Sequence, residues 1–197
     1  MPMTDEMNAI LQQVFDHLAH AARSRRSAMH TAVVATADGN MRTMVLRGFD
    51  RENAVLRFNT DVRSPKIAAI RQDQAMRVLA YDPDAKVQIR MMGQGHVDDR
   101  SPAADAAWAG STTFARRAYL TQGAPGELAG CETSGLPEWA EGINPSEEQV
   151  APARANFALL MVRVTRFDWL YLSSDGHRRA QFDIGDDGAV SGTWLMP

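Results

Sequence analysis

The amino-acid sequence predicts an α+β fold, mainly β, in which peripheral helices surround an antiparallel β-barrel. Three observations support this prediction: the strand-like segments are short, local turns join them, and no βαβ alternation or repeated unit is present. The chain has 197 residues, a hydrophobic fraction of 45% and a formal charge of −3. These values fit one domain, residues 1–197, with an irregular or helical segment at about 101–155, which we call the insert.

The first predicted element is an amphipathic helix near the N-terminus. Thr4 is its expected N-cap, and its apolar side chains recur at spacings of three and four residues, at Met7, Ile10, Leu11, Val14, Phe15 and Leu18. His17 and His20 lie three apart on this helix and could share a face. Polar positions beside the apolar stripe are the favoured interpretation, because no third ligand is evident, and we expect no metal site.

Strands follow this helix. The segments "HTAVVAT" and "MRTMVLRGF" flank "ADGN", whose residues tolerate positive φ, and this pattern predicts a hairpin. "AVLRFNT" is a third strand. A short helix, "IAAIRQ", follows "RSPK", with Ser64 as a possible cap and Pro65 at its first position. "AMRVLAYD" and "KVQIRMMGQGHV" form another strand pair around the turn-prone "PDA".

The pattern changes in the insert. "SPAADAAWAG" resembles a capped helix and "TTFARRAYL" a second one, whereas residues 121–155 are rich in Gly, Pro and acidic side chains. A long irregular segment in a compact domain is either functional or mobile. Three strands complete the chain: "FALLMVRVTRFDWLYL", "RRAQFDI" and "AVSGTWLM".

Composition and motifs exclude several classes of protein. The single cysteine, Cys131, cannot form an internal disulfide, and a free thiol is the favoured interpretation. The segment "MPMTDEMNAI" does not resemble a secretory signal, so we expect a cytoplasmic protein. No apolar run reaches bilayer length, and the slightly acidic charge argues against nucleic-acid binding. The chain also lacks a P-loop, a G-x-G-x-x-G motif, H-E-x-x-H and paired cysteines.

One region is basic. Eight basic residues (Arg42, Arg47, Arg51, Arg57, Arg63, Lys66, Arg71, Arg77) and four acidic residues (Asp50, Glu52, Asp61, Asp73) lie between positions 42 and 77. Within it, "TDVRSPK" combines the hydroxyls of Thr60 and Ser64 with the cations of Arg63 and Lys66 at a helix start. Arg42, on a neighbouring strand, could complete a phosphate site. The alternative is a set of solvated surface arginines.

Four segments together resemble a known family. The order and spacing of "RTMVLRGFD", "LRFNTDVRSPK", "VQIRMMGQGHV" and "FDWLYL...GHRRAQFD...W" are similar to those of the pyridoxamine 5′-phosphate oxidase-like flavoproteins. The resemblance covers most of the chain outside the insert. It implies an FMN-binding split β-barrel, FMN as the cofactor, and a homodimer that holds FMN at the subunit interface.

The resemblance also implies roles for individual residues. Arg42 and the strand through Arg47 would line the FMN phosphate and ring, Lys66 would bind the phosphate, and Gln88 would touch the isoalloxazine. Pro65 stands where the oxidases proper carry an arginine, and Arg63 could substitute for it. Arg178 or Arg179 would reach the ring. The implied cofactor-binding set is Arg42, Thr43, Met44, Val45, Leu46, Arg47, Asn59, Thr60, Arg63, Ser64, Lys66, Gln88, Trp169 and Arg179.

The substrate is less defined by the sequence. Arg116, Arg117 and Tyr119 of "FARRAYL" are candidate contacts, although the family's "RPxxSQ"-like context is absent; Arg47, in place of a substrate-facing lysine, and His177 are further candidates. We expect an FMN-dependent oxidoreductase that transfers hydride between a small organic substrate and FMN, so no catalytic side chain is identified. Alternatives are a true pyridoxamine or pyridoxine 5′-phosphate oxidase, a non-catalytic FMN- or haem-binding protein with His96 or His177 as axial ligand, and a cofactor-free interaction barrel.

Overall fold

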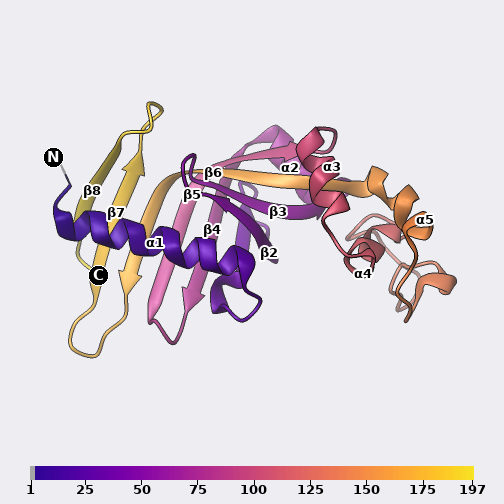
Figure 1. Ribbon diagram of the computed structural model, residues 1–197, viewed down its shortest axis with the longest axis horizontal. Helices are drawn as coiled ribbons and strands as arrows, with labels where there is room; N and C mark the ends of the chain where they lie inside the picture. Colours follow the sequence, from indigo (N-terminus) through magenta and orange to yellow (C-terminus); the bar gives the residue numbers. More distant parts are fainter. Residues whose placement is uncertain (1–2) are drawn as a thin grey trace.

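The computed structural model describes residues 3–197, in which eight antiparallel strands form one sheet that closes on itself. The strands are β1 (Thr31–Thr36), β2 (Met41–Asp50), β3 (Val55–Asp61), β4 (Ala75–Asp82), β5 (Val87–Asp98), β6 (Phe157–Tyr171), β7 (Arg178–Ile184) and β8 (Val190–Leu195). Their order is β3-β2-β1-β4-β5-β6-β7-β8, and an additional β3–β6 pairing closes six of them into a barrel (Figure 1). The predicted antiparallel barrel is confirmed.

The long strand β6 belongs to both parts of the sheet. Its residues 157–163 pair with β3 inside the barrel, and its residues 166–171 pair with β7 outside it. The change of partner lies beside a bulge in β6, where Thr165 is the extra residue opposite the step from Met92 to Gly93 in β5. A Cβ on Gly93 would lie 2.1 Å from the carbonyl oxygen of Arg163, so the backbones approach too closely there for any other residue.

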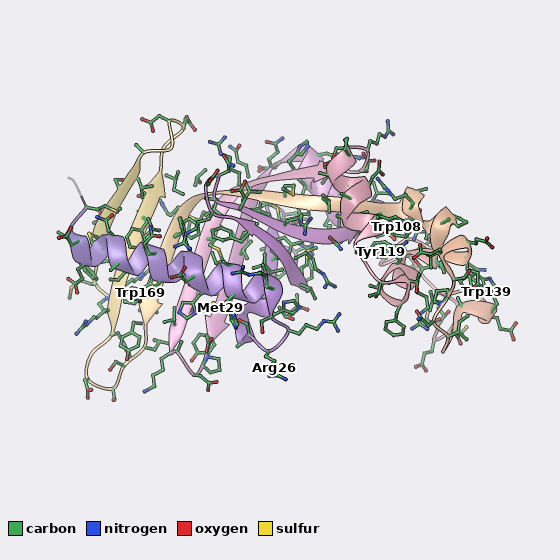
Figure 2. All side chains as sticks on the ribbon, viewed as in Figure 1. Arg26, Met29, Trp108, Tyr119, Trp139 and Trp169 are labelled. Carbon is green, nitrogen blue, oxygen red and sulfur yellow. The ribbon has the colours of Figure 1, made fainter. Side chains whose placement is uncertain are left out.

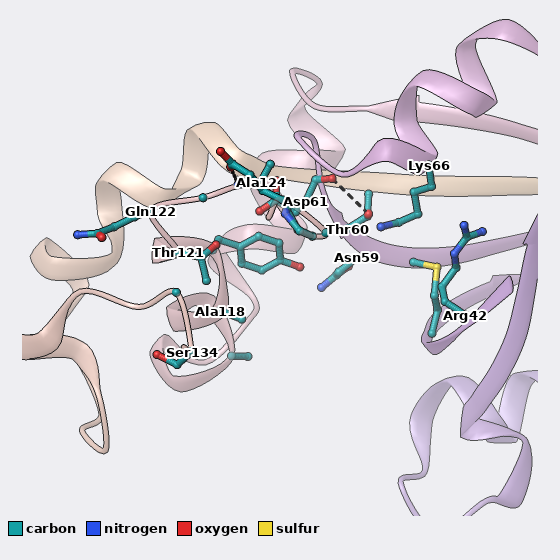
Figure 3. A pocket seen from close by; sticks show the side chains of 18 of the residues that line it. Arg42, Asn59, Thr60, Asp61, Lys66, Ala118, Thr121, Gln122, Ala124 and Ser134 are labelled. Atoms are coloured by element: carbon teal, nitrogen blue, oxygen red, sulfur yellow. Dashed lines mark hydrogen bonds between the residues drawn. The ribbon is translucent and has the colours of Figure 1, made fainter. Parts of the chain in front are cut away.

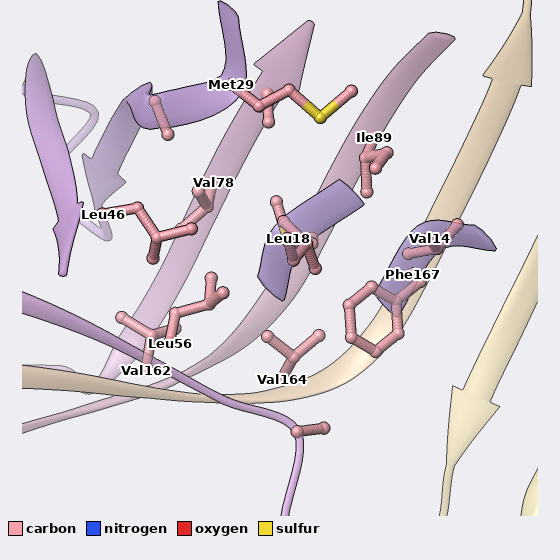
Figure 4. Close-up of a cluster of buried hydrophobic side chains, with 14 of the residues drawn as sticks. Val14, Leu18, Met29, Leu46, Leu56, Val78, Ile89, Val162, Val164 and Phe167 are labelled. Carbon is pink, nitrogen blue, oxygen red and sulfur yellow. The ribbon is translucent and has the colours of Figure 1, made fainter. Parts of the chain in front are cut away.

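Helix α1 (Asp5–Arg23) packs its apolar face on the sheet and forms the main core with it (Figure 4). The Thr4 hydroxyl accepts from the Met7 N–H at 3.3 Å, which confirms the predicted N-cap. Phe15 makes edge-to-face contacts with Phe49 of β2 and Phe167 of β6, each with ring centroids 5.4 Å apart. The helix therefore joins the barrel to the outer strands.

The remaining helices are short. They are η1 (Ala28–His30), α2 (Pro65–Gln72), α3 (Pro102–Ala109), α4 (Thr113–Arg116), η2 (Arg117–Leu120), η3 (Glu138–Ala140), α5 (Glu147–Val150) and η4 (Ala151–Asn156). Pro65 occupies the first turn of α2 as predicted, but the Ser64 side chain does not cap that helix; it accepts from the Lys66 ammonium group at 2.7 Å instead. No helix in residues 3–197 is both long and apolar enough to cross a membrane.

The insert is more ordered than its composition suggests. Trp108, Phe157 and Tyr119 pack edge to face, and these rings join a second hydrophobic cluster at the start of β6. Figure 2 shows Trp108 and Tyr119 close together beside the barrel. This second core fixes the insert against β6, and the insert faces a cavity at that end of the barrel.

Candidate functional site

The candidate site is a cavity of about 890 Å³ between the barrel and the insert. Its barrel wall comes from β2, β3 and α2, and its other wall comes from residues 111–135 (Figure 3). This volume lies in the upper part of the range for small-molecule sites. The structure brings eight residues of the implied FMN set to this cavity: Arg42, Thr43, Met44, Val45, Arg47, Asn59, Thr60 and Lys66.

Arg42 and Lys66 form a cationic end of the cavity. Figure 3 shows them together on the barrel side, across from Gln122 and Ser134 of the insert. Burial and the nearby Arg42 charge lower the pKa of Lys66, and Asp61 opposes this shift. Arg42 donates to the Thr36 hydroxyl at 3.2 Å and to the Val34 carbonyl at 3.4 Å. Two cations held close together in a half-buried site are stabilised by an anion.

Asn59 and Thr60 lie next to this cationic end, on β3. The Asn59 Oδ1 atom is buried and has no hydrogen-bond partner among residues 3–197. A buried acceptor without a donor is costly, so this atom is suited to a bound molecule that carries an N–H or O–H group. FMN offers both the phosphate that the cations require and ribityl hydroxyls and a ring N–H for Asn59. The residues present therefore fit FMN.

Arg47 lies at the other end of the β2 wall. Its position falls in a bulge, because the β2–β3 pairing shifts register between Leu46 and Gly48. The Arg57 guanidinium donates to the Arg47 carbonyl at 2.9 Å and so holds the bulged backbone. Strand geometry separates the Cα atoms of Arg42 and Arg47 by about 16 Å. The cavity thus has two separate cationic positions along one strand.

Tyr119 is the tyrosine on the insert side of the cavity. Burial raises the pKa of its hydroxyl to about 12, with a further increase from Asp61 and a decrease from Arg47. The phenol is therefore neutral at physiological pH and available as a hydrogen-bond donor. Of the three candidate contacts in the insert, Tyr119 lines the cavity, whereas Arg116 and Arg117 do not.

Arg116 is 6% exposed and lies inside the insert. Its guanidinium forms a bidentate ion pair with Glu147, at 2.6 and 3.0 Å, and also donates to the Ser111 carbonyl at 2.8 Å. These contacts attach α4 to α5, and they direct the charge away from the cavity. Arg116 is accordingly a structural residue of the insert.

Arg63 also has other partners. It donates to both carboxylate oxygens of Asp61, at 3.0 and 2.7 Å, and to the carbonyl and hydroxyl oxygens of Thr121, at 2.8 and 2.9 Å. Arg63, Ser64 and Leu46 are not among the residues that line the cavity, and Leu46 belongs to the main core. Arg63 thus connects the barrel to the insert.

Gln88, Trp169, Arg179 and His177 lie elsewhere in the chain. Gln88 and Arg179 share a face of the sheet, since both are in register with Leu170. Trp169 is one position away, on the opposite face, where it is 6% exposed and packs in the main core near α1 (Figure 2). His177 lies in the β6–β7 turn and accepts through Nδ1 from the Ser173 N–H at 3.1 Å. The structure does not bring these four residues to the cavity of the same chain.

Arg179 is held on that outer face by a buried carboxylate. Asp168 is 4% exposed and accepts from Arg179 at 3.0 and 2.8 Å, and it also forms an ion pair with Arg90. Arg178 lies beside His177 in a smaller cavity at the turn. Arg179 is therefore in a fixed position near Gln88.

Sequence reasoning identified only Tyr119 in the insert wall of the cavity. The wall includes the small side chains of Ser111, Ala115 and Ala118 and two loop segments, 121–129 and 133–135. Gly126 and Gly135 in these segments have φ values of +87° and +70°, which other residues rarely adopt. The Gly and Pro content of the insert was the signal that this segment has a role.

Comparison with known proteins adds independent information. Residues 6–99 match the family model described as pyridoxamine 5′-phosphate oxidase, FMN-binding domain. A search of curated proteins found no match.

Solved structures give full-length similarity. A pyridoxamine 5′-phosphate oxidase-related, FMN-binding protein from Nostoc punctiforme PCC 73102 is 26% identical, with a TM-score of 0.71 and coverage of 100% of both chains. PhzG from Burkholderia lata 383, solved with tetrahydrophenazine-1-carboxylic acid, is 18% identical, with a TM-score of 0.67 over 100% of this chain and 94% of that chain. The second similarity concerns the fold alone.

Proposed function

We propose that this chain, whose residues 6–99 match the family model of the pyridoxamine 5′-phosphate oxidase FMN-binding domain, is an FMN-dependent oxidoreductase acting on a small organic substrate. The observation that carries the proposal is the cationic end of the cavity, with Arg42 and Lys66 close together and the unpartnered Asn59 acceptor beside them. These groups complement a flavin phosphate and the hydrogen-bond donors of a flavin.

Each residue then has a physical task. Lys66 and Arg42 hold the phosphate, and the N-terminus of α2 adds favourable partial charge. Asn59 accepts a hydrogen bond from a ribityl hydroxyl or a ring N–H, and β2 lines the flavin along Thr43 and Val45. The insert wall excludes water from the opposite side. FMN, when bound, supplies the electron or hydride transfer, which accounts for the lack of a catalytic nucleophile.

A second copy of the chain would complete the site. Gln88 and Arg179 lie on an outer face of the sheet, away from the cavity of their own chain, and Asp168 fixes the Arg179 guanidinium there. In a homodimer, this face of one copy would cover the flavin ring in the other. We assign Gln88 and Arg179 to that role, and we place Trp169 beneath the same strands as packing support.

A true pyridoxamine 5′-phosphate oxidase is the alternative within the same family. It requires further cations for the substrate phosphate, and Arg116, the sequence candidate, is committed to Glu147. The geometry therefore favours the broader assignment over this one.

The first experiment is to incubate the purified protein with FMN, remove free ligand, and record the visible spectrum with mass identification of the released chromophore. A retained FMN supports the proposal. A colourless protein that also leaves FMN fluorescence unquenched refutes it.

Mixing Lys66→Met copies with Gln88→Ala copies tests whether two chains share one site. A mixed dimer contains one site in which both Lys66 and Gln88 are present, whereas a dimer of either variant alone contains no such site. Failure to regain FMN binding would refute the dimer arrangement.

A further inference from the structure

We propose that the substrate side of this cavity takes a small organic monocarboxylate, rather than a phosphate ester, and that Arg47 pairs with the carboxylate. The inference rests on the proposed function, because it assumes that the FMN phosphate occupies the end formed by Arg42 and Lys66. Three observations carry it: the insert wall, the engagement of the insert arginines, and the geometry of Arg47.

The insert wall provides no cation. Its cavity-lining residues, from Ser111 to Gly135, include no Lys or Arg, and its only carboxylate is Glu127. That carboxylate accepts from the Ala124 N–H at 2.9 Å and adds negative charge to the rim. A phosphate dianion placed against this wall would meet hydroxyls, small apolar side chains and a negative charge. The wall thus disfavours a doubly charged substrate.

Both arginines of α4 and η2 have partners of their own. Arg116 is buried with Glu147, as described above. Arg117 donates to the Ile143 carbonyl at 2.7 Å and lies 4.5 Å from the centroid of the Phe114 ring. Turning either side chain toward the cavity would leave Glu147 or the carbonyl oxygens without their donors. A third arginine of the insert, Arg154, pairs with Asp105 at 2.7 Å. These three arginines are therefore not available for a phosphate.

Arg47 is the remaining cation on the substrate side. Its guanidinium makes no hydrogen bond or ion pair within residues 3–197, although Arg57 holds its backbone in the bulge. A bulge re-aims the side chain that it carries, and a guanidinium fork matches the two oxygens of one carboxylate. The neutral Tyr119 phenol in the same cavity can donate one more hydrogen bond. The Arg47 guanidinium and the Tyr119 hydroxyl together suit a ligand group that carries a single negative charge.

A matched series of ligands with the same phenyl ring tests this inference: benzoate, phenyl phosphate and benzamide. Each is titrated into the FMN-loaded protein, and the change in the flavin absorption spectrum reports binding. We expect benzoate to bind at least about 10-fold more tightly than either other ligand, because a charged hydrogen-bonded contact contributes about this factor or more. Arg47→Gln should remove that preference, Arg47→Lys should keep part of it, and Arg51→Gln, an equal charge loss outside the cavity, should keep all of it.

The outcomes separate the two proposals. Protein that fails to retain FMN refutes the proposed function. Protein that retains FMN but binds phenyl phosphate or benzamide as tightly as benzoate overturns only the carboxylate inference. The same holds if benzoate causes no spectral change up to its solubility limit, or if Arg47→Gln binds benzoate unchanged.

Discussion

Lys66 offers a specific test of the site, because we expect its removal to weaken FMN binding without lowering the stability of the ligand-free protein. In the ligand-free protein, burial and the Arg42 charge lower the pKa of Lys66, so its ammonium form is disfavoured in the folded state. Lys66→Met keeps most of the buried stem and removes the charge. We therefore expect no loss in the free energy of unfolding of the ligand-free protein.

The affinity for FMN, in contrast, should fall. A hydrogen bond to a charged group contributes about 1.5–3 kcal/mol, which corresponds to roughly a 10- to 150-fold loss of FMN affinity. Riboflavin, which lacks the phosphate, should bind to the variant almost as it binds to the unmodified protein. Fluorescence quenching measures both affinities, and denaturant unfolding measures stability.

Two further variants make this comparison specific. Arg71→Met removes an equal charge from the exposed last turn of the same helix and should change neither affinity. Arg63 contacts Asp61 and Thr121 and has no assigned contact with the phosphate. Any loss of affinity in Arg63→Gln should therefore be equal for FMN and riboflavin. Equal losses of FMN and riboflavin affinity in Lys66→Met would refute the assignment of Lys66 to the phosphate.

Three other predictions concern stability and pH. Gly93→Ala should destabilise the fold by more than about 3 kcal/mol or prevent folding, because its Cβ would overlap the Arg163 carbonyl oxygen; a loss below about 1 kcal/mol in denaturant unfolding would contradict this. Arg116→Gln should cost about 1–3 kcal/mol and speed proteolysis within the insert, because two carbonyl oxygens lose their donor and the exposed Glu147 carboxylate loses its ion pair; unchanged cleavage rates would contradict the tether. The lowered pKa of Lys66 means that the free energy of unfolding of the ligand-free protein rises as pH increases through that value towards 10.5. FMN affinity, measured by titration across the same range, should fall, because binding then requires proton uptake, and Lys66→Met should lack this alkaline decrease.

Local signals in the sequence were sufficient for most of the fold. The Thr4 cap and the apolar stripe identify α1, the "ADGN" turn identifies the first hairpin, and Pro65 marks the start of α2. These features depend on residues within a few positions of one another. The family resemblance added the split barrel and placed Asn59 with Arg42 and Lys66, and the cavity brings these three residues together.

The sequence could not reveal which arginines are already paired. Arg63 and Arg116 look like phosphate ligands in the sequence, but their partners Thr121 and Glu147 lie 58 and 31 positions away. Such contacts depend on how the insert packs on β6, and no periodic pattern encodes that packing. Trp169 differs from its expected position for another reason. Side chains alternate along a strand, so adjacent positions on β6 face opposite sides of the sheet. The sequence pattern did not show which side Trp169 faces.

The basic region between positions 42 and 77 acts as a set of separate charges rather than one patch. Three of its cations, Arg42, Arg47 and Lys66, line the cavity. The other five have partners or positions away from it: Arg51 pairs with Asp16, Arg57 with the Arg47 carbonyl, Arg63 with Asp61, Arg77 with the Met76 carbonyl, and Arg71 is exposed on α2. This division leaves two cations where a phosphate is proposed and one where a substrate is proposed. The charge that the cavity can accept is thus set mainly by which arginines the fold has already paired.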